Sequence, residues 1–369
     1  MPTATNIEWA DITINPTRGC SHCSPGCDHC YAERFAARLA RNPKAGKAYA
    51  GLVDFKGRWT GRVSDYDLSV FDNLPKTPKR IFVGSMTDLF FSGVNDTPRQ
   101  AITTVDGTTY EFAPDILHAR LAMILIEIGK YPQHTFMFLT KRPAAMREVM
   151  LLMLNRPLPN LWLGVTVCNQ EEAHAKIPAL LATPAVKRFV SIEPMLGPVD
   201  LTSIDYLEGQ IEGADESGIL DALRGLTMDD APTHPALDWV ICGGETGPGS
   251  RPMHPDWVRR LRDQCKDAEV PFFFKSWGEW LPCSDSPDDL DFEKHASGFI
   301  GDDGIFDAGN DGAFQCRNGV RDEQTFRVGK RTAGRLLDGQ EHNEIPMPSV
   351  PMCCSICGGS GHIGDCEGD

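Results

Sequence analysis

The feature that most constrains the fold is an alternation of short apolar runs and helical segments between residues 80 and 285. The apolar runs are rich in β-branched and aromatic residues and lie at 80–84, 135–139, 161–165, 188–192, 238–242 and 271–275. Segments with helical periodicity lie between them, at 115–130, 143–153, 171–182 and 255–268. Continuous apolar strands separated by helices are typical of a parallel sheet with a covered outer face. With a first strand near 10–14, the sequence predicts an α/β fold: a partial or full TIM-like (β/α) barrel.

Polar residues and glycines directly follow most of the predicted strands. They include Ser85, Thr87, Asp88, Lys141, Arg142, Glu193, Gly243, Gly244 and Glu245. Any one of them would be explained by loop capping alone. The active sites of β/α barrels, however, form at the carboxyl ends of their strands. We therefore expect these side chains to share one functional rim.

Four thiols lie within eleven residues after the first predicted strand, in Cys20-Ser-His-Cys23-Ser-Pro-Gly-Cys27-Asp-His-Cys30. We call residues 20–30 the thiol loop. Clustered thiolates prefer a soft metal, as zinc or as an iron–sulfur cluster. A disulfide or a set of buried structural cysteines is less compatible with a polar, turn-rich loop.

The number of thiols that act as ligands distinguishes a structural zinc site from an iron–sulfur cluster with one iron left free. Structural zinc would take all four thiols or recruit His22 or His29. An open iron–sulfur cluster would take three thiols and leave one iron free for chemistry. Two triples fit, Cys23, Cys27 and Cys30 or Cys20, Cys27 and Cys30.

The chain is predicted to divide into three parts. Residues 1–285 would form the barrel, and 286–345 an irregular acidic extension that ends in a short helix at 328–338. Residues 346–369 are a Cys-rich tail in which zinc is one possibility against free thiols. The candidate zinc ligands of the tail are Cys354, Cys357, His362 and Cys366.

Composition indicates the compartment and limits the partners. The 369 residues include 13 cysteines, and no apolar run or charged hydrophobic leader predicts a membrane or secretory segment. We expect a cytoplasmic protein without a membrane partner, in the host cytoplasm if it is phage-encoded. The net charge of −15 argues against generic phosphate binding, although much of the acid lies at 205–230 and 284–311.

A C-x3-C-x2-C loop after the first strand of a β/α barrel resembles the radical S-adenosylmethionine (SAM) superfamily. The resemblance implies a [4Fe–4S] cluster whose fourth iron chelates SAM. An electron from the cluster would cleave SAM to methionine and a 5′-deoxyadenosyl radical. It also implies a reductase or flavodoxin-type electron donor.

A narrower resemblance, to the phage three-Cys-motif family, covers some 320 residues. It rests on 14–20, 24–34, Gly84-Ser-Met-Thr-Asp-Leu-Phe90, Leu139-Thr-Lys-Arg-Pro143, Ser191-Ile-Glu-Pro-Met195, Gly243-Gly-Glu-Thr246 and 329–339. The family pattern C-x6-C-x2-C implies Cys20, Cys27 and Cys30 as cluster ligands, with Cys23 as the alternative to Cys20.

The resemblance also implies SAM-binding residues on the rim. Ser85, Thr87 and Asp88 lie where the superfamily contacts the SAM amino group. Glu193 would bind the ribose hydroxyls or the ammonium, and Lys141 with Arg142 a carboxylate or phosphate. The triplet Gly243-Gly244-Glu245 has the same residues as the "GGE" SAM-contact motif of the superfamily. It follows the sixth predicted strand, however, so its position differs from that of the motif.

Members of the phage family that the chain resembles occur in pathways that hypermodify thymine in viral DNA, a modification that counters restriction. The resemblance therefore implies an isomerase that converts N-linked to C-linked glycinyl-thymidine, with modified thymine in DNA or a nucleotide as substrate. A base in duplex DNA would have to be flipped out. Two alternatives remain: a radical SAM enzyme of another class, such as a repair lyase or a methylating enzyme, and a non-enzymatic structural zinc protein.

Overall fold

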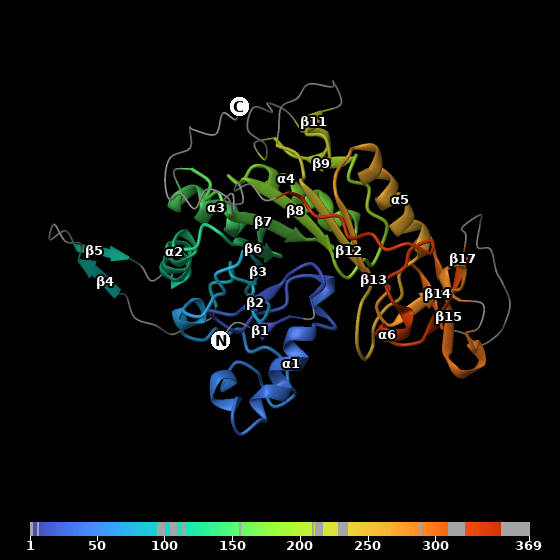
Figure 1. Ribbon diagram of the computed structural model, residues 1–369, viewed down its shortest axis with the longest axis horizontal. Coiled ribbons are helices and arrows are strands. Elements are labelled where there is room, and N and C mark those ends of the chain that lie inside the picture. Colours follow the sequence, from blue (N-terminus) through green and yellow to red (C-terminus); the bar gives the residue numbers. More distant parts are fainter. Residues whose placement is uncertain are drawn as a thin grey trace, which may run out of the picture.

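The computed structural model describes residues 3–5, 7–93, 100–103, 109–112, 116–154, 156–208, 210, 217–227, 235–287, 290–308 and 322–347. Its main sheet has eight strands, and all neighbours but the first pair run parallel. In sheet order they are β1 (Thr3–Ala4), β2 (Ile12–Ile14), β3 (Arg80–Val83), β6 (Thr135–Thr140), β7 (Leu161–Thr166), β8 (Lys187–Ile192), β12 (Trp239–Gly243) and β13 (Phe272–Ser276). The seven parallel strands curl into a half-barrel, which confirms the predicted α/β class and all seven predicted strands (Figure 1).

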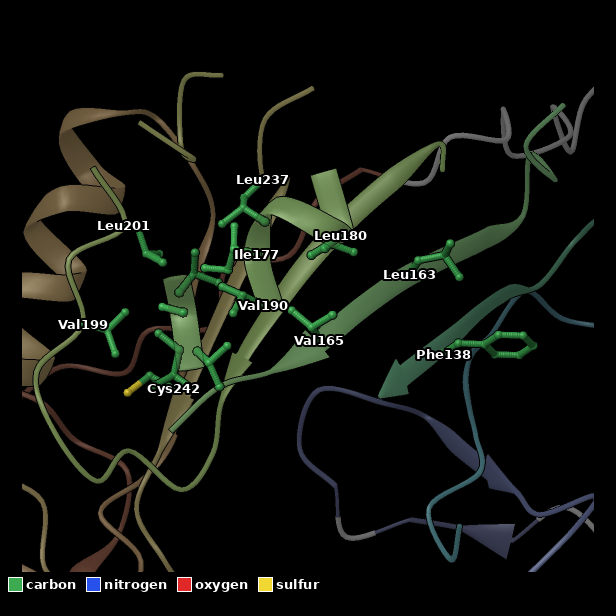
Figure 2. Packing of buried hydrophobic residues seen from close by; sticks show 14 of the residues in the cluster. Phe138, Leu163, Val165, Ile177, Leu180, Val190, Val199, Leu201, Leu237 and Cys242 are labelled. Carbon is green, nitrogen blue, oxygen red and sulfur yellow. The ribbon is translucent and has the colours of Figure 1, made fainter. Parts of the chain in front are cut away.

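Four helices cover the outer face of the half-barrel (Figure 1). They are α2 (Ile116–Gly129), α3 (Pro143–Met153), α4 (Gln170–Leu181) and α5 (Pro255–Asp267), within a few residues of the predicted segments. Figure 2 shows how α4 packs, with Ile177 and Leu180 lying over Val165 and Val190 of the sheet. All four side chains are fully buried, and each contributes about 1.5–3 kcal/mol of hydrophobic free energy.

The concave face of the half-barrel is filled by large side chains instead of helices. Alternate residues of each strand point to opposite faces, and the concave set forms a separate core. Trp239 lies at its centre, with Phe189 and Phe273 about 6 Å away between ring centroids and Trp162 edge-on. These rings occupy the half of the concave face nearest the amino ends of the strands, so only the carboxyl ends remain available to a ligand.

The half-barrel does not close, and a late segment of the chain protects its last edge. The amide of Phe274 in β13 donates to the carbonyl of His342, and the amide of Glu344 donates to Phe272. The indole of Trp239 also donates to the carbonyl of Glu344, at 2.8 Å. An uncovered edge strand would be a template for aggregation, so residues 342–344 take the place of an eighth parallel strand.

Helix α1 (Tyr31–Ala40) differs from the other helices because it does not cover the sheet. Its buried residues Ala32 and Ala36 pack against Tyr49, Leu52 and Met86 in a small separate core. Residues 31–62, which we call the α1 lobe, project on the side of the sheet away from α2–α5 (Figure 1).

The remaining strands form small antiparallel sheets outside the half-barrel. One contains β9 (Ile204–Tyr206), β10 (Gly218–Asp221) and β11 (Leu226–Thr227), within the first acidic segment. A hairpin of β4 (Gln100–Thr103) and β5 (Thr109–Phe112) precedes α2. Neither was predicted from the sequence.

The extension at 286–345 is more regular than we expected. A four-stranded antiparallel sheet forms from β14 (Trp280–Pro282), β15 (Ala296–Gly301), β16 (Phe306–Asp307) and β17 (Asp322–Arg327). The expected helix at 328–338 is only α6 (Lys330–Ala333). It ends there because Gly329 and Gly334, with φ of 86° and 67°, hold conformations that break a right-handed helix. None of the helices that the structure describes is long and apolar enough to cross a membrane.

Candidate functional site

The thiol loop leaves the carboxyl end of β2 and leads into α1. Cys27 ends a short 3-10 helix, η1 (Pro25–Cys27), in which the hydroxyl of Ser24 accepts from the amide of Gly26 at 3.2 Å. Gly26 lies so close to the end of β7 that a Cβ there would approach the thiol of Cys168 to 2.5 Å. Cys30 is the residue that caps α1. The loop is therefore packed onto the mouth of the half-barrel.

The first anchor of the loop comes from residues after β3. The hydroxyl of Thr87 donates to the carbonyl of Gly19 at 2.7 Å, and the amide of Gly19 donates to Met86 at 3.0 Å. Gly19 has a φ of 103° and lies against the carbonyl of Arg62, which a Cβ would approach to 2.2 Å. Only glycine fits there, directly before the first thiol.

The second anchor is a buried carboxylate, Asp88. It accepts from the hydroxyl of Thr140 at 2.6 Å, from the backbone amides of Phe90 and Lys141, and from the guanidinium of Arg142 at 3.0 Å. The same guanidinium donates to the carbonyl and hydroxyl of Ser21. Asp88 thereby holds the thiol loop to the end of β6 through one arginine.

The third anchor comes from the segment after β12. Both carboxylate oxygens of Glu245 accept from Arg251, at 2.6 and 2.9 Å. Arg251 in turn donates to the carbonyl of Pro25 at 2.9 Å and to Asp28 at 3.3 Å. A further contact, from Arg34 of α1 to the carbonyl of Thr246 at 2.7 Å, joins the same two segments.

The thiols lie in a cationic surrounding. Cys27 is buried, Cys20 and Cys30 are half-buried and Cys23 is exposed. Burial raises the pKa of Cys20 to about 11 and also raises the pKa of Cys30. A hydrogen bond from Cys23 lowers the pKa of Cys27, which favours a thiolate there.

Lys141 supplies part of that positive charge. Burial alone would lower its pKa, but coulombic interactions with the thiol groups of Cys168, Cys27 and Cys30 and with Asp88 outweigh burial and raise it. The pKa of Arg142 is raised in the same way, first by Asp88 and then by Cys23 and Cys20. The donor set is therefore three or four soft ligands with two fixed cations beside them, a combination that suits a negatively charged thiolate cluster.

Within the described residues, no three His, Cys, Asp or Glu side chains are grouped so that they could hold a single metal ion. This finding concerns a site of the zinc type, where all ligands converge on one point. Thiols that bind a cubane cluster each bind a different iron and need no such convergence. The predicted tail ligands Cys354, Cys357, His362 and Cys366 lie outside the described residues.

A second polar group lies on the concave face beside the loop. Lys275 of β13 contacts a carboxylate oxygen of Glu193 at 3.3 Å, and Ser191 donates to the same oxygen at 3.4 Å. The other oxygen of Glu193 is buried and has no hydrogen-bond partner among the described residues. It faces Gly243, where a Cβ would come within 3.0 Å. Pro194, the residue after Glu193, lies so close to Gly26 of the thiol loop that a Cβ on Gly26 would approach its ring to 3.1 Å, which places this group beside the loop.

The structure brings some predicted rim residues together and separates others. Glu193, Gly243 and Lys141 lie around the concave mouth and the thiols. Ser85 instead exchanges hydrogen bonds with Asn15, and its carbonyl accepts from Tyr31 at 2.7 Å. Thr87, Asp88 and Glu245 direct their polar atoms to the anchors described above. Gly244 packs against the carbonyl of Trp277, which a Cβ would approach to 2.0 Å.

The sequence also places Cys168 and Lys275 on the rim, since they follow or end predicted strands, but they were assigned no role there. Arg251 was not selected. Arg251 lies in the loop after Gly243-Gly-Glu245 and carries no local signal of its contact with the thiol loop, since Pro25 and Asp28 are over 200 residues away in the sequence. One cavity of about 440 Å³ lies elsewhere, between α4 and α5, and is lined by none of these residues.

Glu172 makes the site's surroundings sensitive to acid. Burial would raise its pKa, but the ammonium of Lys176, at 2.6 Å, outweighs this and lowers the pKa below 4.5. The carboxylate also accepts from the amide of Cys168 at 3.0 Å. Because the folded pKa is depressed, its contribution to stability is present above pH 4.5 and is lost as the pH falls through the folded value.

We therefore expect the E172Q variant to be less stable than the wild type at neutral pH and to lose less stability on acidification. Chemical unfolding at a series of pH values from 7 down to the acid limit of folding measures both effects. The matched control is E171Q, because Glu171 is exposed on the same helix turn. Parallel pH curves for wild type and E172Q would contradict the role of Glu172.

Fold and site together define an α/β half-barrel protein whose first parallel strand, β2, is followed by a thiol-bearing loop held across the mouth of the sheet. The sequence matches the family described as protein of unknown function (DUF5131) over residues 4–124 and 111–346. The chain belongs to this family. No curated protein and no solved structure matches it.

Proposed function

We propose that the protein is a radical SAM enzyme with a partial barrel of that superfamily's type, and most specifically an isomerase acting on glycinyl-thymine. The observation that carries the proposal is the place of the thiol loop. Four thiols follow the first parallel strand and are held over the carboxyl ends of the others by Thr87, Arg142 and Arg251. This is the end of the sheet at which β/α proteins bind their ligands.

Cys27 and Cys30, with Cys20 or Cys23, would hold the [4Fe–4S] cluster. When bound, the cluster and SAM would supply a radical that abstracts a hydrogen atom from an unactivated carbon. The chain's own residues would position the reactants and exclude water. The aromatic rings of the concave face close the floor beneath them, and the ammonium of Lys141 would offset the negative charge of the cluster.

Glu193 and Lys275 would orient a zwitterion at the mouth. The unpartnered oxygen of Glu193 can accept from an ammonium or a hydroxyl group, and Lys275 can attract a carboxylate. SAM and a glycine attached to thymine both carry such groups. Isomerisation exchanges a C–N bond for a C–C bond without a net redox change, so it needs orientation of the glycine rather than an additional oxidant.

Anaerobic reconstitution with iron and sulfide, followed by reduction and addition of SAM, tests the proposal. We expect a brown protein that releases 5′-deoxyadenosine, and conversion of DNA carrying N-linked glycinyl-thymine to the C-linked isomer by nucleoside mass spectrometry. Release of 5′-deoxyadenosine without isomerisation would favour a repair lyase or a methylating enzyme. A colourless protein that holds zinc and no iron would exclude radical chemistry.

A further inference from the structure

Positive charge is concentrated in the α1 lobe, although the whole chain is acidic. Residues 31–62 contain eight Arg and Lys side chains and two acidic ones, a net charge of +6 within a chain of net charge −15. The two acidic residues do little to offset this charge at the surface. Glu33 is buried and binds His22 and the amide of Trp59, and Asp54 accepts from the amides of its own turn.

Most of these cations are exposed and form no ion pair within the described residues. The exposed ones are Arg38, Arg41, Lys44, Lys47, Lys56, Arg58 and Arg62. Within the described part of the chain, only Arg58 has an ion pair, with Glu33 at 4.0 Å. Elsewhere the structure pairs its cations closely, as in Arg251 with Glu245. Unpaired surface cations at this density attract a polyanion.

Exposed aromatic rings alternate with these cations along α1. Tyr31 and Phe35 are 50% and 40% exposed, and Arg38 follows one helical turn later. The spacing of four and three residues puts the three side chains in one stripe. The guanidinium carbon of Arg38 lies 4.7 Å from the centre of the Phe35 ring. Phe55 lies outside α1, in the turn at 54–57 of the same lobe; it is 87% exposed and lies 5.5 Å from the ammonium of Lys56.

The stripe starts at the candidate active site. Tyr31 directly follows Cys30, and its hydroxyl donates to the carbonyl of Ser85 on the rim. Arg34, one turn further, reaches the carbonyl of Thr246 on the opposite side of the mouth. A polymer lying along α1 would therefore lead into the mouth of the half-barrel.

We propose that the α1 lobe binds a single strand of DNA, with phosphates on its cations and bases stacked on Phe35 and Tyr31. Every base presents a flat π-face, so ring stacking with a basic track is the usual means of binding single strands without sequence preference. Duplex DNA would offer its phosphates but not its base faces. This surface would make a DNA strand, rather than a free nucleotide, the substrate of the proposed isomerase. To that extent the inference rests on the proposed function.

Fluorescence anisotropy of the reconstituted protein with a labelled thymine-rich strand about 15 nucleotides long tests the surface. F35A is expected to weaken binding about 10-fold with an unchanged salt slope, since it removes stacking alone. The double variant R38A/R41A is expected to lower the slope of log affinity against log salt by about 1.4, or ~0.7 for each lost phosphate contact. Duplex DNA of the same sequence should bind more weakly than the single strand.

Two matched controls lie outside the lobe. L152A removes an exposed apolar side chain from α3, and K294A removes a cation that is 76% exposed. Both should bind DNA as the wild type does. Equal affinity of wild type and F35A, or equal affinity for poly-glutamate of the same charge, would overturn the proposal.

Release of 5′-deoxyadenosine without DNA, measured on the same preparations, separates the two proposals. SAM cleavage without DNA binding would refute the proposed DNA-binding role of the α1 lobe and leave the proposed chemistry intact. DNA binding that depends on Phe35, in a protein that cleaves no SAM, would refute the chemistry and leave the surface intact.

Discussion

Replacement of Cys27 by alanine is expected to abolish iron binding and SAM cleavage together. Cys27 belongs to both candidate ligand triples, and it is the one buried thiol of the loop. Loss of an outer-shell partner of a metal site typically costs ~10–100-fold in affinity or activity. Loss of a direct ligand should exceed this, so we expect release of 5′-deoxyadenosine to fall by more than about 100-fold.

Iron content per chain and the visible spectrum after anaerobic reconstitution measure the first effect. C283A is the matched control, because Cys283 is an exposed free cysteine in another segment. A C27A protein that keeps both its iron and its activity would exclude Cys27 as a ligand and with it both triples.

The same measurements on C20A and C23A assign the third ligand. The resemblance to the three-Cys-motif family favours Cys20, whereas the spacing of the wider superfamily favours Cys23. Cys20 is half-buried and follows the fixed Gly19, while Cys23 is exposed between anchored positions. We expect C20A to lose iron and C23A to retain it; the reverse result would assign Cys23.

The half-barrel could be predicted because most of its strands are built around short runs of apolar residues. Both faces of the sheet are buried, one under helices and one under aromatic rings. Residues such as Phe136 and Met137, or Phe272 and Phe273, are therefore all apolar even though they point to opposite faces. That pattern needs no knowledge of distant contacts.

The extension at 286–345 could not be predicted in the same way. Its strands β15 and β17 pair with each other across a sequence rich in Asp and Gly, and neither alternates regularly between apolar and polar residues. Strand β17 pairs on its other side with β14, whose Trp280 and Leu281 are buried. Pairing partners, rather than local propensity, determine such strands.

The rim residues were located correctly along the chain, but their partners were not predictable. The sequence places Asp88 and Glu245 after strands, and both do lie at the mouth. Their carboxylates face Arg142 and Arg251, which bind backbone carbonyls of the thiol loop. Whether such a carboxylate meets a ligand or an internal arginine depends on long-range geometry that a single sequence does not contain.

Replacement of Asp88 by alanine is expected to have the second large effect, a loss of unfolding free energy. That loss distinguishes a residue that anchors the thiol loop from one that binds SAM. D88A would leave Arg142 without its carboxylate and would remove the acceptor of two backbone amides. Breaking a buried ion pair by removing one partner costs about 3–5 kcal/mol. We expect about 3 kcal/mol of unfolding free energy here, the lower limit, because the side chain of Arg142 is 18% exposed.

Denaturant unfolding measures this loss, and E148A, an exposed acidic position on α3, is the matched control. R142A should show a similar loss, and the double variant D88A/R142A should lose less than the sum, because the two side chains act as one anchor. If Asp88 instead bound the amino group of SAM, D88A would keep its stability and raise the KM for SAM. The carboxylate of Asp88 already accepts from Thr140, Arg142 and two backbone amides. We therefore expect D88A to lower the stability of the protein, and with it the fixed placement of the thiols, rather than to change the KM for SAM alone.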